Sequence, residues 1–263
     1  MSKGHKIPIL LLRIDYKDRI EELCLNGHIY MGLVSKYHKK ANNSQSELIS
    51  DHYEGKGTTW IRQFIDLNPP NDAKGPNLCY LGTGKQSFLN ANQCVFCMIG
   101  VEKISESEET WTLPWPEILG MLGERKVDEC AVLIMWDTTN FIKRWQTEML
   151  KRDLFSMAGF VEYDDHDFDN KHDSFTAGYA LESCFHKDKR YAGQHEYRFA
   201  ACANEKEDIK DLYIGKLDER SYGDLPIDEG KSLAITIIPK ASGVGNAYYA
   251  SWVQDSPLHP PKT

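Results

Sequence analysis

The sequence lacks a long apolar run and a secretory signal. No stretch approaches the roughly 20 apolar residues that are needed to cross a bilayer. The longest apolar run, residues 7–14, contains Arg13, is followed by Asp15 and lacks a small-residue cleavage site. We therefore interpret this run as a first buried strand, and we expect a cytoplasmic protein with no membrane partner.

Signatures of common nucleotide-binding and hydrolytic enzymes are also missing. No apolar strand leads into G-x-G-x-x-G, the usual mark of a dinucleotide fold, and no G-x-S-x-G elbow supports serine hydrolase chemistry. The segment LGTGKQS at 81–87 has glycines and a lysine, but Cys79 replaces the first glycine of a phosphate loop and Gln86 replaces its Ser or Thr. We predict a tight turn between two strands there.

The cysteine and metal-ligand patterns favour no special chemistry. Seven scattered cysteines fit reduced, buried thiols better than a disulfide framework. Cys94 and Cys97 form a C-x-x-C, but positions i and i+3 of a strand face opposite sides, and no second C-x-x-C completes a zinc site. The segment DDHDFDNKHD at 164–173 has no EF-hand spacing, so we predict a solvated loop and no metal site.

The charge balance excludes a protein that grips nucleic acid by bulk electrostatics. The formal net charge is −8, although basic runs at 36–40 and 186–190 are candidates for a local groove. Each run alone is more typical of solvated surface lysines. The composition, 41% hydrophobic and 27% charged, is that of an ordinary globular protein, and 263 residues can bury a substantial core.

Hydrophobic patterning predicts a strand-rich chain with few helices. Strands are expected at 7–14, 28–34, 58–65, 93–101, 130–136, 159–165, 179–187, 195–203, 211–217 and 232–239. Helices are expected at 15–27, 114–124 and 137–153; the first ends at Asn26-Gly27 and the last has Asp137 as its N-cap. Long polar loops are expected at 38–58 and 66–77. Because no repeat or linker forces a boundary, we predict a single α+β domain over residues 1–263.

A Q-x-E triplet opens one of the predicted strands, within the run KDKRYAGQHEYRFAACA at 187–203. Residues i and i+2 of a strand point the same way, so Gln194 and Glu196 are expected to reach one substrate together. Arg198 continues that row, whereas Tyr197 is expected to face the core.

The order of motifs along the chain resembles a family of bacterial proteins associated with ADP-ribosyltransferase-like toxins and phage-defence effectors. The matching pieces span most of the chain: a first strand with Arg13, a helix leading to NGHIYMGLVSKYHKK, DHYEG at 51–55, VFCMIG, KDKRYAGQHEYRFA and LYIGKLDE at 212–219. The resemblance implies an ADP-ribosyltransferase-like split sheet. It also implies an NAD-dependent mono-ADP-ribosyltransferase that acts, as a toxin or defence effector, on nucleic acid or protein.

The resemblance assigns roles to five residues. Arg13 would grip the phosphates or ribose of NAD, Tyr30 would offer an aromatic face to nicotinamide, and Ser35 would place a hydroxyl nearby. Glu196 would stabilise the oxocarbenium-like ribose cation that forms when nicotinamide leaves, and Gln194 would position the acceptor. The Ser-Thr-Ser strand of the arginine-modifying class is absent, which leaves the middle catalytic position unassigned.

Other interpretations stay open from the residues alone. Arg13 could pair with Asp15, and Tyr30 could be a core tyrosine. Glu196 and Arg198 could satisfy each other in a catalytically silent interaction module, and a nuclease-like effector could use the Asp/His loop with a metal. An active toxin would need an antitoxin or inhibitor protein in its own cell, for which the loops at 38–58 and 66–77 are the expected docking surfaces.

Overall fold

A computed structural model describes residues 7–36, 56–66, 78–89, 92–102, 107, 109–164, 181, 183–239 and 246–254, with the backbone alone for 56–66 and 78–89. The strands are β1 (Leu10–Tyr16), β2 (His28–Leu33), β3 (Lys56–Asp66), β4 (Leu78–Leu89), β5 (Gln93–Val101), β6 (Glu109–Leu113), β7 (Cys130–Met135), β8 (Ser156–Phe160), β9 (Glu162–Asp164), β10 (His186–Asp188), β11 (Glu196–Cys202), β12 (Ile209–Tyr213), β13 (Tyr222–Pro226), β14 (Lys231–Pro239) and β15 (Asn246–Gln254). The helices are α1 (Lys17–Asn26), α3 (Trp115–Leu122) and α4 (Thr138–Lys151), with 3-10 turns η1 (Val127–Glu129), η3 (Ser183–Phe185) and η4 (Lys189–Gln194).

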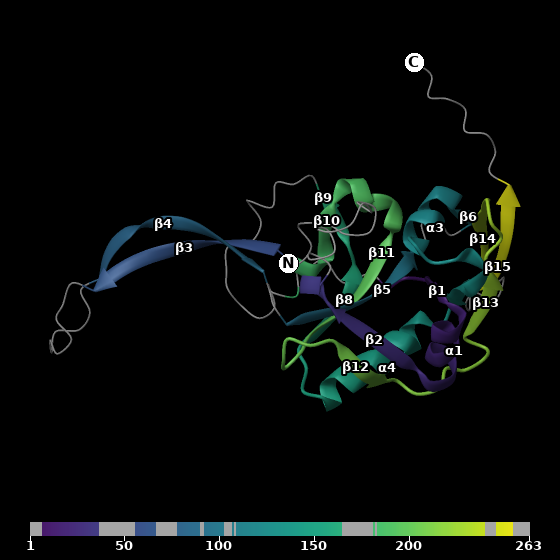
Figure 1. Ribbon diagram of the computed structural model, residues 1–263, viewed down its shortest axis with the longest axis horizontal. Helices are drawn as coiled ribbons and strands as arrows, with labels where there is room; N and C mark the ends of the chain where they lie inside the picture. Colours follow the sequence, from purple (N-terminus) through teal and green to yellow (C-terminus); the bar gives the residue numbers. More distant parts are fainter. Residues whose placement is uncertain are drawn as a thin grey trace, which may run out of the picture.

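An antiparallel main sheet forms the centre of the molecule (Figure 1), in the order β12-β2-β5-β1-β7-β13, with β11 and then β8 attached to the other edge of β5. β11 pairs with residues 93–99 of β5. The opposite edge of β5 is shared, because β2 pairs with Cys94 and Val95 whereas β1 pairs with residues 99–101. The main sheet is therefore split between β1 and β2, beside residues 96–98 of β5.

Each face of the main sheet is covered by a different layer. Helices α1 and α4 pack on one face, where Phe141, Trp145 and Met149 of α4 join the strands in a buried hydrophobic cluster. On the other face, α3 and the small sheet β15-β14-β6 enclose a second cluster around Leu12 and Ile235. The strand-rich α+β class with few helices is thus confirmed.

The helix boundaries follow the predicted signals. α1 ends at Gly27, which has a left-handed backbone (φ 68°) and donates its N–H to the Leu23 carbonyl at 3.0 Å. α4 begins after Asp137, whose carboxylate accepts the Asn140 N–H at 3.4 Å. Both predictions are confirmed.

Several local predictions were wrong. Residues 179–187 were expected to form a strand, but of the part that the structure describes, 183–185 form the turn η3, and β10 begins at His186. LGTGKQS at 81–87 is not a turn but lies inside β4, which pairs with β3 along its length. β6, β13 and β15 were not predicted, since β6 follows an acidic connector and β13 contains glycine, aspartate and proline, which are rare in strands.

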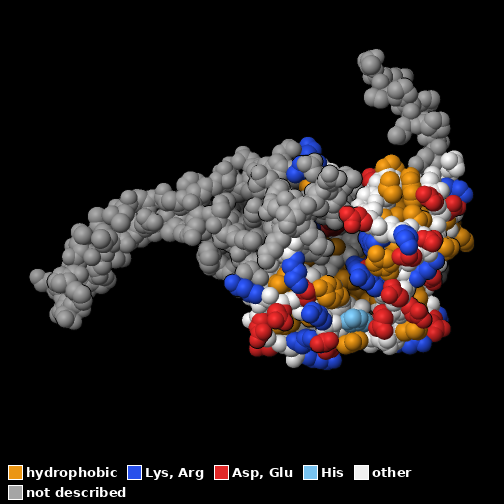
Figure 2. All heavy atoms as spheres, in the orientation of Figure 1, with side chains coloured by type: hydrophobic (Ala, Val, Ile, Leu, Met, Phe, Trp, Pro, Cys, Tyr) orange, Lys and Arg blue, Asp and Glu red, His pale blue; other side chains and the backbone are white. Residues whose placement is uncertain are grey.

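Strands β3 and β4 form a separate two-stranded sheet outside the main sheet. Figure 1 shows β3 and β4 projecting from the body as a two-stranded ribbon. On the face drawn in Figure 2, acidic and basic side chains are interspersed. None of the helices in the described part of the chain has the length and apolar character that a bilayer crossing requires.

The two cysteines of the C-x-x-C face opposite sides of β5, as predicted. Cys94 is buried in the cluster beneath the helices, whereas Cys97 packs with the small cluster on the other face. Burial raises the pKa of the Cys94 thiol to about 11, so this thiol is protonated at neutral pH.

Gly27 generates the first testable prediction. A Cβ at this position would lie 2.3 Å from the Gly215 carbonyl oxygen, so Gly27→Ala adds a backbone clash to the strain of a positive φ. Gly230 is a matched control, because its φ is +79° and its Cβ would meet nothing within 4 Å. In urea unfolding we expect Gly230→Ala to lose about 1 kcal/mol and Gly27→Ala at least about 2 kcal/mol more. Equal losses would show that the close approach of Gly215 does not constrain the fold.

Candidate functional site

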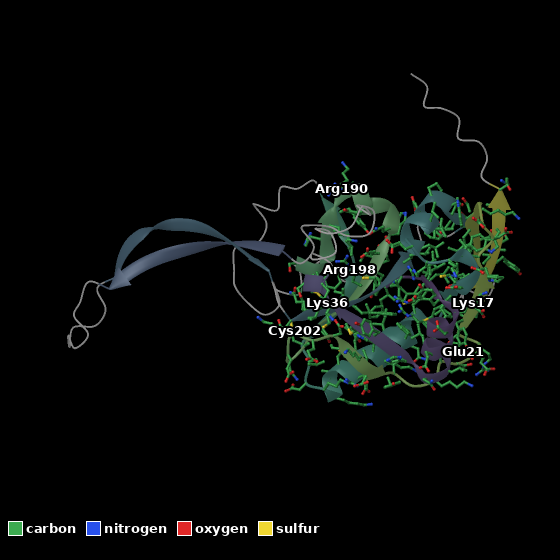
Figure 3. The ribbon with its side chains drawn as sticks, in the orientation of Figure 1. Lys17, Glu21, Lys36, Arg190, Arg198 and Cys202 are labelled. Carbon is green, nitrogen blue, oxygen red and sulfur yellow. The ribbon has the colours of Figure 1, made fainter. Side chains whose placement is uncertain are left out.

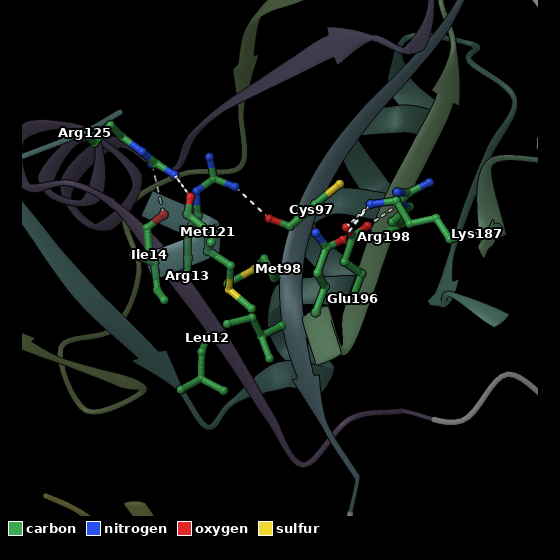
Figure 4. A pocket seen from close by; sticks show the side chains of 13 residues that line it. Leu12, Arg13, Ile14, Cys97, Met98, Met121, Arg125, Lys187, Glu196 and Arg198 are labelled. Carbon is green, nitrogen blue, oxygen red and sulfur yellow. Dashed lines mark hydrogen bonds and ion pairs between the residues drawn. The ribbon is translucent and has the colours of Figure 1, made fainter. Parts of the chain in front are cut away.

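A cavity of about 200 Å³ lies beside the split in the main sheet, between β1, β5, β11 and α3. Its polar lining consists of Arg13, Arg125, Lys187, Gln194, Glu196 and Arg198. Figure 4 shows Arg13 on one side of β5 and Glu196, with its cationic neighbours, on the other side. The structure therefore brings three of the predicted site residues, Arg13, Gln194 and Glu196, to one cavity.

Among the described residues that line this cavity, Glu196 is the only acidic one, and both of its carboxylate oxygens are bonded. Oε1 accepts a hydrogen bond from Lys187 Nζ at 2.6 Å, and Oε2 accepts one from Arg198 Nε at 2.6 Å. Burial alone would raise the pKa of Glu196, but the charges of Arg198 and Lys187 outweigh burial and lower it to about 2. Glu196 is therefore a fixed anion at neutral pH.

The Arg198 guanidinium is fixed by further contacts besides Glu196. Its side chain is fully buried, and its second contact is a hydrogen bond from Nη1 to the Cys184 carbonyl. Figure 3 places Arg198 inside the body, whereas Arg190 and Lys36 lie at the periphery. The pairing of Glu196 with Arg198, one of the interpretations left open by the sequence, is present in the structure.

Lys187 is one of the site residues that the sequence did not reveal. The basic run at 186–190 suggested solvated lysines, but Lys187 is only 2% exposed. Its Nζ donates to Gln194 Oε1 at 2.7 Å as well as to Glu196, and it lies 5.2 Å from the centre of the Tyr191 ring. No periodicity marks this lysine, because the turn η4 separates it from β11.

Gln194 and Glu196 meet for a reason other than the predicted strand alternation. Gln194 ends η4, and β11 begins only at Glu196. His195 between them has a left-handed backbone (φ 46°), which a strand does not allow. The two side chains come together because both accept hydrogen bonds from Lys187.

Arg13 spans the split in the sheet. Nη1 donates to the Cys97 carbonyl of β5 at 2.7 Å, and Nη2 donates to Asp15 Oδ2 at 2.5 Å. The guanidinium lies over the Phe96 ring, 4.4 Å from its centre. The pairing with Asp15, one of the interpretations left open by the sequence, is confirmed, and 24% of the Arg13 side chain remains exposed.

Asp15 gathers three guanidinium groups. Besides Arg13, Arg125 Nη1 lies 3.0 Å and Arg19 Nη1 3.5 Å from Asp15 Oδ1. Burial opposes the ionised form, but Arg13, the Tyr16 N–H and Arg125 hold the pKa of Asp15 below its usual value. Asp15 thus fixes the positions of three guanidinium groups beside the split in the sheet. Arg125 has no signal in the sequence, since it is 110 residues away from Asp15.

Tyr30 and Ser35 do not join the Glu196 cavity. Tyr30 lines a second cavity of about 820 Å³, which shares Arg13 and Cys97 with the first. Tyr30 is 49% exposed, so the interpretation as a core tyrosine is wrong. A ring bound on Tyr30 would lie in a cavity that Glu196 does not line, and Ser35 lines neither of these two cavities.

The predicted Asp/His loop lies outside the described residues from position 165 onward. Within the described ranges, no group of three or more His, Cys, Asp or Glu side chains could hold a metal ion. The described site offers a fixed carboxylate among cations. Such a carboxylate can stabilise a developing positive charge, while the surrounding cations bind an anion.

Comparison of the chain with models of known protein families, with curated proteins and with solved structures gave no match.

The lowered pKa of Glu196 gives a prediction for stability. A carboxylate with a folded-state pKa near 2, against a usual value of 4.5, contributes stability that is present above about pH 4.5 and is lost as the pH falls toward 2. Glu196→Gln removes this contribution and takes away the anion that Lys187 and Arg198 share. We expect the variant to be less stable than the parent by on the order of 3 kcal/mol at pH 7, with the difference shrinking below pH 4.5.

Urea unfolding between pH 7 and pH 2.5 measures this difference. Glu129→Gln is the control, because its ion pair with Lys126 is exposed and contributes little stability. A difference between Glu196→Gln and the parent that stays constant with pH would mean that the ionised form of Glu196 is not preferentially stabilised by folding.

Proposed function

We propose that this protein is an NAD-dependent mono-ADP-ribosyltransferase, a cytoplasmic toxin or defence effector that modifies nucleic acid or protein. The observation that carries the proposal is the Glu196 carboxylate, held as an anion at the wall of a cavity whose other polar side chains are mostly cationic. Gln194 lies beside it, joined through Lys187, and Arg13 lies across β5. An antitoxin or inhibitor protein is part of the same proposal, because such an activity must be restrained in its own cell.

The proposed reaction uses the fixed charge of Glu196. The bond between ribose C1′ and the nicotinamide nitrogen breaks, its electron pair leaves with nicotinamide, and C1′ becomes cationic. A nucleophilic atom of the acceptor then bonds to C1′ and releases its proton to water. A preorganised carboxylate stabilises the cation by several kcal/mol, and each ~1.4 kcal/mol changes the rate tenfold.

The size and charge of the two cavities support NAD as the substrate. A cavity of about 200 Å³ is smaller than the ~300–1,000 Å³ of typical ligand sites, so it accommodates one end of a dinucleotide. Arg13 belongs to both cavities and carries a partly exposed guanidinium, which suits a pyrophosphate between the two ends. The split of the main sheet beside Arg13 is the feature that favours an ADP-ribosyltransferase-like arrangement.

A catalytically silent interaction module is the competing function. The observation that favours it is the saturation of Glu196, since both oxygens already bond to buried cations. A silent module requires Glu196 for stability alone. In a transferase, replacing Glu196 would reduce NAD turnover by more than the loss of stability explains. Turnover and stability can be measured separately.

Glu196→Gln is predicted to nearly abolish nicotinamide release from NAD, because the substitution keeps the size of the side chain and removes its charge. Purified protein is incubated with NAD, and free nicotinamide, ADP-ribose and modified acceptor are quantified. Met149→Ala is the matched control: it creates a cavity in the core beneath α4, with a cost of ~2–5 kcal/mol, away from the site. If Glu196→Gln retains parental turnover, or Met149→Ala loses as much, Glu196 has no catalytic role.

Gln194→Ala separates acceptor positioning from NAD cleavage in the same assay. Its amide oxygen bonds to Lys187, while the carboxylate of Glu196 keeps its own contacts with Lys187 and Arg198. We expect transfer to the acceptor to fall at least tenfold more than hydrolysis of NAD to ADP-ribose. An equal fall of both products would remove the assigned role of Gln194.

Arg13→Lys tests the proposed grip on the phosphates. The lysine keeps a positive charge near Asp15 but lacks the planar guanidinium, which donates to Asp15 and to the Cys97 carbonyl at the same time. We expect NAD affinity, measured by calorimetry, to fall roughly tenfold. Arg144→Lys, whose guanidinium bonds to the Lys216 carbonyl away from both cavities, should bind NAD like the parent. Lower thermal stability of Arg13→Lys with unchanged NAD affinity would favour a purely structural ion pair.

A further inference from the structure

The strand β15 differs from the other edge strands of the main sheet and the small sheet. Strands β6, β8, β12 and β13 have five residues each, whereas β15 has nine. In addition, β12 carries Lys210 and Asp211, and β13 carries Asp224 and Pro226. Short length, charge and proline are features that keep a sheet edge from pairing with another chain. β15, with the sequence NAYYASWVQ, has none of these features.

The outer edge of β15 offers backbone groups for a further strand. β15 pairs with β14 along all nine residues, and no other strand in the described part of the chain pairs with it. Successive residues of a strand direct their N–H and C=O groups to alternate sides, so every second residue of β15 presents both groups away from β14. Figure 1 shows β15 at the outer margin of the body, where a second molecule can approach it.

The core-facing side of β15 holds the strand in place. Tyr248, Ala250 and Trp252 pack against the second hydrophobic cluster, beneath the small sheet. The Tyr248 ring stacks on Trp136, with centroids 6.5 Å apart, and Trp252 Nε1 donates to the Pro226 carbonyl at 3.0 Å. Because the strand is ordered in the single chain, pairing with another strand costs little conformational entropy.

The outer face of the small sheet is uncharged at β15 and beside it. Tyr249 is 63% and Val253 38% exposed, and Ser251 between them is exposed as well. The same face continues across the sheet through uncharged residues of β14 and β6: Ala234, Thr236, Thr110 and Thr112. Two copies of a chain with a net charge of −8 repel each other, so they meet at the least cost where neither surface is charged.

The sequence of β15 is complementary to itself in antiparallel pairing. About a two-fold axis through Ala250, all nine residues of one copy lie opposite all nine of the other. Tyr248 then lies opposite Trp252 on the core-facing side, and Tyr249 lies opposite Ser251 on the outer face. Small residues meet at the axis, aromatic pairs flank it, and an amide side chain meets an amide side chain at each end. Cross-strand pairs of this kind stabilise a sheet.

We propose that β15 pairs with β15 of a second copy of this chain, antiparallel and centred on Ala250, so that the two small sheets join into one continuous sheet. Two-fold dimers are the commonest soluble oligomers, and they use the same surface on both subunits. β15 contributes no residue to the described lining of the two cavities, so the inference does not rest on the proposed transferase activity.

Sedimentation velocity over roughly a hundredfold range of protein concentration tests the dimer. We expect the parent to sediment as a dimer that dissociates on dilution. Tyr249→Lys combined with Ser251→Lys places like charges opposite each other twice across the axis, and the dissociation constant should rise at least about tenfold. Thr110→Lys combined with Thr112→Lys is the matched control. It adds the same charges to the same face of the sheet, but on β6, and should dimerise like the parent.

A charge swap tests the pairing of positions 249 and 251. Tyr249→Glu combined with Ser251→Glu should also be monomeric alone. An equimolar mixture of this variant with the Tyr249→Lys, Ser251→Lys variant should form dimers that contain one chain of each, because every new ammonium group then faces a new carboxylate. Circular dichroism melts like that of the parent show that both variants fold.

A parent that is monomeric at every concentration overturns the proposal, and β15 is then free or covered by another protein or another segment. A dimer that persists in the Tyr249→Lys, Ser251→Lys variant, or a mixture that stays monomeric, overturns it as well. Equal weakening by the Thr110→Lys, Thr112→Lys control would reduce the effect to general repulsion and also reject the pairing. Glu196→Gln should dimerise like the parent whether or not the protein cleaves NAD, so the dimer and the transferase fail independently.

Discussion

The ion triad of Lys187, Glu196 and Arg198 is the interaction on which the rest of the site depends. One carboxylate bonds at 2.6 Å to each of two cations that are almost completely buried. The contacts join β10 to the first residues of β11 and draw in Gln194 from η4. Without the carboxylate, Lys187 and Arg198 would lose the anion that they share, and the turn that precedes β11 would lose its link to that strand.

Asp15 likewise pairs with several cationic side chains, on the other side of β5. It gathers Arg13, Arg19 and Arg125 beside the split between β1 and β2. The two cavities share Arg13. The excess of positive charge lies in the cavity that Glu196 lines, where Arg13, Arg125, Lys187 and Arg198 surround one carboxylate, so an anionic ligand is favoured there.

Much of the fold could be predicted from local sequence, whereas the site could be predicted only in part. The apolar run of β5 and the stripe of Phe141, Trp145 and Met149 specify their own burial through periodicity. Arg13 and Asp15 are two residues apart on one strand, so their pairing was foreseeable. Lys187 and Arg125 were not, because their contacts depend on an irregular turn and on a packing contact between distant segments. The strand β4 was missed because its glycines and lysine resemble a turn.

The composition of the triad bears on the choice between a silent module and an enzyme. A buried ion pair generally gives no more stability than well-packed apolar side chains of the same volume. Stability alone therefore does not explain why Lys187, Glu196 and Arg198 line a cavity, where apolar residues would fill the space. In a cavity the same three charges do what an apolar core cannot. Lys187 and Arg198 lower the pKa of the buried Glu196 carboxylate to about 2, and the cations that line the cavity can attract an anion. This combination favours a chemical role for Glu196 over a purely structural one.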